Sequence, residues 1–152
     1  MRIEIDTKEL DKKLEAALMA FALEFAGKLA DAAPADTGEL RAAIRNGYSV
    51  KRDGTGWLIS FNMPIHAAYI EFGTGIYGPK GTPIVPRVKK TLAWEAGVKY
   101  RGKYGSMHEF SGSKNWYAFK WVRGIHPMPF IRPTFHQHYV STLERNLRRF
   151  VK

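Results

Sequence analysis

The chain has 152 residues, of which 45% are hydrophobic and 13% aromatic, so it can bury a core and is expected to form one domain over residues 1–152. It contains no cysteine, which excludes disulfide bonds and thiolate metal sites. Residues 1–50 carry a net charge of −2 and residues 51–152 carry +12, so any attraction for an anionic partner arises in the second two-thirds of the chain.

The first predicted element is a long amphipathic helix that follows Asp6 or Thr7 as N-cap and ends at Pro34. At about 1.5 Å per residue it is as long as a small domain is wide. Either one end projects and packs on a neighbour, or the helix lies wholly across its own sheet. The start lacks the apolar core of a signal peptide and no run of eighteen apolar residues follows, so we expect a soluble protein without a membrane partner. The apolar stripe of the helix consists of Leu10, Leu14, Leu18, Phe21, Phe25 and Leu29.

A short helix and a hairpin are predicted next. Asp36 has the properties of an N-cap for a helix up to residue 46, with Glu39 three residues on. In residues 47–64 apolar residues alternate on both sides of Asp53-Gly54-Thr55-Gly56, which predicts two antiparallel strands joined by a tight turn.

The rest of the chain predicts two helices and two strands. Residues 65–73 have a helical spacing, residues 88–95 and 115–123 have strand composition, and residues 97–115 are expected to form an exposed basic loop. Residues 126–133 are expected to be extended, and residues 134–152 to form a helix with Phe135, Tyr139, Leu143 and Leu147 on its apolar face. The order predicts an α+β fold in which a small antiparallel sheet of about four strands is packed by a long N-terminal helix and a C-terminal helix.

Gly73, Gly75 and Gly78 have the G-x-G-x-x-G spacing of a dinucleotide-binding loop. That loop needs a strand before the glycines and a helix after them. Here a helical pattern precedes them, and Pro79, Pro83 and Pro86 interrupt the residues that follow. We therefore expect the glycines to serve the path of the chain, with no bound cofactor.

Catalytic and metal-binding patterns are weak. The histidines and the carboxylates after residue 50 are scattered, and no serine has the surroundings of a nucleophile. We expect no catalytic residue, no metal site and no enzyme activity. Glu71 ends a helix, where a carboxylate is disfavoured, so it either pairs with Arg132 or an arginine of another subunit or is solvated. The basic loop contains Lys99, Arg101 and Lys103, which face either DNA or a protein partner.

Three segments in sequence order, "APADTGELRAAI", "AAYIEFGTGIYGPKG" and "HPMPFIRPTF", resemble motifs of the tail-completion, or head–tail joining, proteins of long-tailed bacteriophages. The resemblance spans most of the chain. It departs from the family pattern at Ala43, at Met128 and in the longer loop near residues 97–115.

The resemblance implies a structural virion protein at the head–tail junction or proximal tail, which is in the host cytoplasm during assembly. It implies a ring-forming homo-oligomer, with a hexamer as one candidate, that joins a connector or stopper to tail-terminator or tail-tube proteins and touches packaged DNA weakly. The alternative is a basic nucleic-acid-binding protein of phage origin. The interface residues implied are Tyr69, Glu71, Phe72, Gly73, Thr74, Gly75, Pro129, Phe130, Arg132 and Pro133.

Overall fold

The structure is a computed structural model that describes residues 7–34, 38–95, 108–109 and 116–151. Contacts divide it into two compact units. We call Met1–Ala67 with Pro129–Lys152 the helical unit, and Ala68–Met128 the inserted unit. The single domain expected over residues 1–152 stays a prediction, and each unit is described by itself. Among the described residues, no helix has the length and apolar character needed to cross a membrane.

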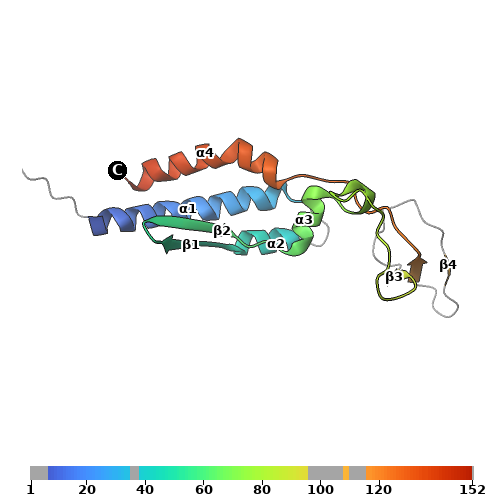
Figure 1. Cartoon of the computed structure of the whole chain (residues 1–152). Helices are drawn as coiled ribbons and strands as arrows, with labels where there is room; N and C mark the ends of the chain where they lie inside the picture. Colours follow the sequence, from blue (N-terminus) through green and yellow to red (C-terminus); the bar gives the residue numbers. More distant parts are fainter. Residues whose placement is uncertain (1–6, 35–37, 96–107, 110–115, 152) are drawn as a thin grey trace, which may run out of the picture. The chain divides into compact units, whose positions relative to one another are not determined.

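The helical unit is built around α1, Thr7–Ala32, which lies between α4, Ile131–Phe150, on one side and α2, Glu39–Asn46, with a β-hairpin on the other (Figure 1). The hairpin pairs β1, Tyr48–Asp53, with β2, Gly56–Phe61, in antiparallel register from Tyr48↔Phe61 to Asp53↔Gly56. These elements confirm the two long helices, the hairpin and its turn. α2 differs from the expectation because Gly38, with φ of 83°, takes the N-cap position and no side chain caps the helix. Asp36 lies outside the described residues.

Five aromatic rings pack together in the helical unit, and two of them, Phe21 and Phe25, are fully buried. Phe25 is fully buried, and its ring centroid lies 5.5 Å from that of Phe61 and 5.6 Å from that of Phe135. Phe21 stacks on Phe25 and meets Tyr139 edge to face at 5.4 Å. Because Phe25 meets Phe135 while Phe21 meets Tyr139, α4 runs antiparallel to α1. Near the N-terminal end of α1, Asp11 forms an ion pair of 2.6 Å with Arg52 of β1.

The two predicted apolar stripes differ in how far their residues are buried. On α1, Leu18, Phe21, Phe25 and Leu29 are buried, whereas Leu10 is 44% exposed. On α4 the buried residues are Thr134, Thr142 and Asn146, and Phe135 of the predicted stripe is 44% exposed. The apolar spacing therefore located α4 correctly but did not identify its most buried residues.

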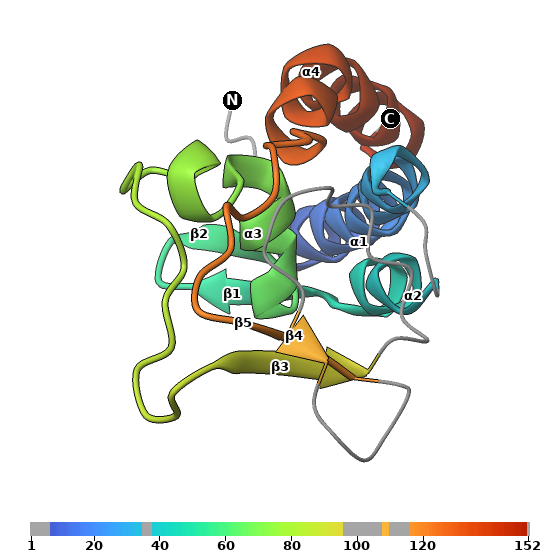
Figure 2. The same cartoon turned by 90° about the vertical axis from the view of Figure 1, so that its right-hand side faces the viewer.

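The inserted unit contains a second, separate sheet (Figure 2). α3, Ile65–Phe72, leads into it and is followed by the short 3₁₀ helix η1, Gly75–Tyr77. β3, Leu92–Glu95, and β4, His108–Glu109, pair antiparallel with β5, Trp116–Phe119, which lies between them. The single sheet of about four strands is thus wrong, because the later strands pair with one another inside the inserted unit and leave the hairpin on its own. β4 lies within the segment predicted as a loop, residues 97–115, and all other residues of that segment lie outside the described part.

Candidate functional site

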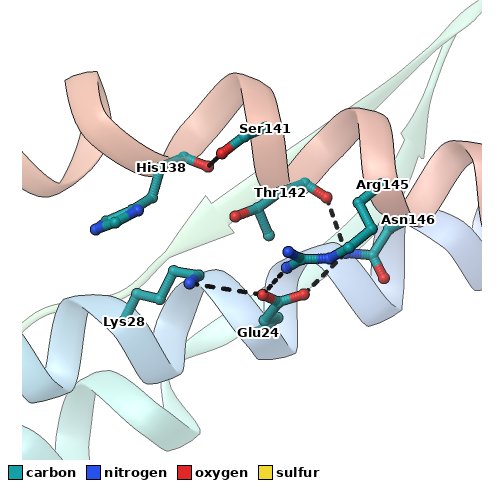
Figure 3. Close-up of polar contacts among 7 residues, drawn as sticks. All are labelled: Glu24, Lys28, His138, Ser141, Thr142, Arg145 and Asn146. Atoms are coloured by element: carbon teal, nitrogen blue, oxygen red, sulfur yellow. Dashed lines mark hydrogen bonds and ion pairs between the residues drawn. The ribbon is translucent and has the colours of Figure 1, made fainter.

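A polar cluster joins α1 to α4 (Figure 3). The Glu24 carboxylate accepts hydrogen bonds from the Arg145 guanidinium and from Asn146 Nδ2, the latter at 3.1 Å. Asn146 Nδ2 also donates to the Thr142 carbonyl at 2.9 Å, and Lys28 Nζ lies 3.7 Å from Glu24 Oε1. Thr142 and Asn146 are buried, and these contacts satisfy polar groups between two packed helices. We interpret these contacts as a structural cluster that stabilises the packing of α4 on α1, and we call it the lock.

The lock predicts a dependence of stability on pH. The hydrogen bond from Arg145 holds the pKa of the Glu24 carboxyl below its ordinary value of 4.5, with help from Asn146 and Lys28 and against the effect of partial burial. Because the pKa is lower in the folded state, this stabilisation is complete above the unfolded-state pKa and is lost as the pH falls through the folded-state pKa. We expect the free energy of unfolding, measured with urea, to fall more between about pH 6 and pH 3 in the native chain than in Glu24→Gln. Parallel pH profiles would contradict the lock.

The second candidate site is a close backbone contact within the inserted unit, which we call the glycine clasp and define as residues 73–76 with residues 123–127. Thr74 N donates to the Ile125 carbonyl at 3.0 Å, and Ile125 N donates to Thr74 Oγ1 at 2.9 Å. Ile76 N donates to the Arg123 carbonyl at 2.8 Å. The clasp brings together two segments that lie about fifty residues apart in the sequence.

The glycines of the clasp are needed for both conformation and space. Gly73, Gly75 and Gly124 have φ values of 74°, 64° and 95°, which side chains rarely adopt. A Cβ on Gly73 would lie 2.9 Å from the Ile125 carbonyl oxygen, and a Cβ on Gly75 would overlap the Arg123 carbonyl. The backbone that the glycines approach is therefore that of the chain itself. A helix precedes them and only three residues of 3₁₀ helix follow, so this is not the strand–turn–helix of a dinucleotide loop.

A ring contact extends the clasp. The Tyr77 and His126 rings are stacked with centroids 3.5 Å apart. Among the residues that the structure describes, His126 included, no three His, Asp or Glu side chains are grouped as metal ligands would be. The stacking instead fixes residues 77 and 126 on the two sides of the clasp.

Four of the predicted interface residues outside the clasp lie at the start of α4 or just before it. α4 begins at Ile131, so Arg132 and Pro133 are helical and the expected extension over residues 126–133 is wrong at its end. Proline is tolerated there because the first-turn amides of a helix need no intrahelical acceptor. Phe130 is buried at 3% exposure, whereas Pro129, Arg132 and Pro133 are exposed.

The remaining candidates lie in the inserted unit. Tyr69 is 50% exposed and Phe72 is 48% exposed, which suits contact residues. Glu71 is only 1% exposed, so the solvated carboxylate is excluded, and its pairing with an arginine stays a prediction. Lys99, Arg101 and Lys103 lie outside the described residues.

Sequence reasoning missed a cavity of about 430 Å³ beside the clasp. Its lining residues come from three separate segments, and no spacing rule connects them. Trp121 belongs to residues 115–123, whose composition predicts only a strand. A tryptophan close to arginine is nevertheless a combination that is enriched at protein interfaces. The cavity is lined by Ile76, Pro83, Val85, Lys120, Trp121 and Arg123.

Among the residues of the inserted unit whose burial the structure describes, most large apolar side chains are exposed. Among its described residues, the buried hydrophobic ones are Ala118 and Phe119. Large exposed apolar patches commonly mark interaction sites. The apolar residues more than a third exposed are Tyr69, Phe72, Ile76, Ile84, Val85, Val88, Trp121, Ile125 and Met128.

Comparisons of the chain with protein-family models, with curated proteins and with solved structures found no match.

Proposed function

We propose that this protein is a structural virion subunit of a long-tailed bacteriophage, which assembles with copies of itself into a ring at the head–tail junction or proximal tail. The observation that carries the proposal is the apolar surface of the inserted unit, where nine large hydrophobic side chains are more than a third exposed. A chain with such a surface gains stability when another subunit covers it.

Three sequence motifs support the same function. Two of them, "EFGTGIYG" and the start of "HPMPF", contribute to the clasp or adjoin it, since Gly73 closely approaches Pro127. A ring requires two different complementary surfaces on each subunit. The exposed apolar residues of the inserted unit would provide one of them.

Charge favours a second candidate, a nucleic-acid-binding protein. Residues 68–128 contain ten Lys and Arg against three Glu, a net charge of +7 out of the +10 of the whole chain. A monomer whose affinity for duplex DNA falls steeply with salt would support this alternative. A ring that binds DNA weakly would favour the virion subunit.

The decisive experiment is electron microscopy of phage particles produced without this protein. We expect filled heads and separate tails, because the joining layer is missing. Normal joining of heads to tails would overturn the proposal.

A substitution tests whether the exposed apolar surface assembles. We expect Tyr69→Ser to lower the mass of the assembly in sedimentation analysis, because it removes an exposed aromatic side chain from the proposed interface. Val140→Ser is the matched control, since Val140 is 63% exposed on α4 in the helical unit. Equal masses for both variants and the native chain would exclude Tyr69 from the interface, and unchanged melting would show that folding is intact.

A further inference from the structure

The cavity of the inserted unit combines apolar walls with cationic side chains. Ile76, Pro83, Val85 and Trp121 supply the walls, and Trp121 is 45% exposed. Lys120 and Arg123 line the same cavity. Its volume of about 430 Å³ lies within the range of about 300–1,000 Å³ for ligand sites. The site therefore suits a ligand that carries apolar groups next to negative charges.

The net charge of the inserted unit predicts the sign of the ligand's charge, and the apolar walls of the cavity predict the ligand's chemical class. With a net charge of +7 over residues 68–128, the unit attracts anions. Duplex DNA presents phosphates outside while its bases are stacked inside, so it leaves an apolar cavity unfilled. A polypeptide with aliphatic side chains beside carboxylates fills the cavity and places its charges near Lys120 and Arg123.

Residues 1–6, Met-Arg-Ile-Glu-Ile-Asp, have this chemistry. Ile3 and Ile5 alternate with Glu4 and Asp6, so in an extended bound state the apolar and acidic side chains would lie on opposite sides. Three of the carboxylates further along the chain form ion pairs within the helical unit. Asp11 pairs with Arg52, Glu24 with Arg145, and Asp31 with Arg45.

Residues 1–6 directly precede Thr7 at the start of α1 in the helical unit, whereas the cavity belongs to the inserted unit. A segment of one copy bound in the cavity of the next copy is the heterologous kind of contact from which rings are built.

We propose that residues 1–6 of one copy bind in the inserted-unit cavity of a neighbouring copy, with Ile3 and Ile5 against Trp121. Glu4 and Asp6 then lie beside Lys120 and Arg123. This inference rests on the proposed assembly of copies into a ring, and it supplies a head-to-tail contact of the kind that a ring requires.

The absence of cysteine allows a direct cross-linking test in the full chain. We would co-express an Ile5→Cys chain with a Val85→Cys chain and oxidise mildly. The expected result is a disulfide-linked heterodimer at a yield about tenfold above that of Ile5→Cys with Val88→Cys, because a docked segment has a high effective concentration. Val88 is 97% exposed in the same unit and does not line the cavity, so it reports random collision.

Two additions identify what occupies the cavity. Trp121→Ala in the Val85→Cys chain is expected to reduce the heterodimer to the collision level, and a synthetic peptide of residues 1–8 is expected to compete with it. Competition by a 20-base-pair DNA duplex but not by the peptide would overturn the proposal in favour of nucleic acid. An intramolecular disulfide in the monomeric double variant Ile5→Cys/Val85→Cys would overturn exchange between copies.

Native mass spectrometry separates this inference from the function. If copies form a ring while the cross-link stays at the collision level, residues 1–6 do not bind there and the ring proposal stands. If the protein remains monomeric at all concentrations and no cross-link forms, both proposals fail.

Discussion

Phe25→Ala is expected to destabilise the helical unit by about 3–5 kcal/mol in the free energy of unfolding. Phe25 is fully buried and its ring meets those of Phe21, Phe61, Phe135 and Tyr139, with centroids 5.5 to 6.0 Å away. Truncation removes the apolar area and leaves a cavity among four rings that are held by three different elements. Domains are stable by only about 5–15 kcal/mol, so this loss is a large fraction of the total.

The measurement is urea unfolding followed by far-ultraviolet circular dichroism, with Leu23→Ala as the control. Leu23 lies two positions away on α1 and is 58% exposed, so its truncation is expected to change stability by less than about 0.5 kcal/mol. Similar losses in the two variants would show that the aromatic cluster is not the centre of the core.

Local sequence patterns predicted the elements of the helical unit because their causes are local. The i, i+3, i+4 spacing gave α1, and the glycine turn at residues 53–56 gave the hairpin. The buried positions of α4 were not predictable in this way. Thr142 and Asn146 are polar and become suitable for burial only because Glu24 of α1 accepts a hydrogen bond from Asn146.

Pairing between distant segments explains the other errors. The strand composition of residues 88–95 and 115–123 predicted β3 and β5, but not that they would form a sheet separate from the hairpin. Likewise, the order of Gly73 and Gly75 indicated unusual backbone conformations but not their partner. That partner, residues 123–127, lies about fifty residues away and has no motif that points to the glycines.

The second large effect is expected at the glycine clasp, where Gly75→Ala should disrupt the backbone pairing. Gly75 has φ of 64°, and its added Cβ would overlap the Arg123 carbonyl, which accepts the hydrogen bond of Ile76 N. Gly81→Ala is a matched control in the same unit, because Gly81 has φ of 60° and an added Cβ there meets no atom within 4 Å. The left-handed conformation costs roughly 1–2 kcal/mol in both variants, so the difference between them isolates the steric contact.

Hydrogen exchange at the Ile76 and Thr74 amides measures the opening of the clasp directly, since both amides donate hydrogen bonds across it. We expect exchange in Gly75→Ala to be at least about tenfold faster than in Gly81→Ala, because the carbonyl of Arg123 must move away to admit the Cβ. Equal exchange rates in the two variants would mean that the positive φ alone, without the steric contact to Arg123, explains why position 75 is a glycine. Because Ile76 and Arg123 also line the cavity, a clasp opened by Gly75→Ala should deform that cavity as well. The glycines would then act on assembly through the shape of the surface, without touching a neighbouring subunit themselves.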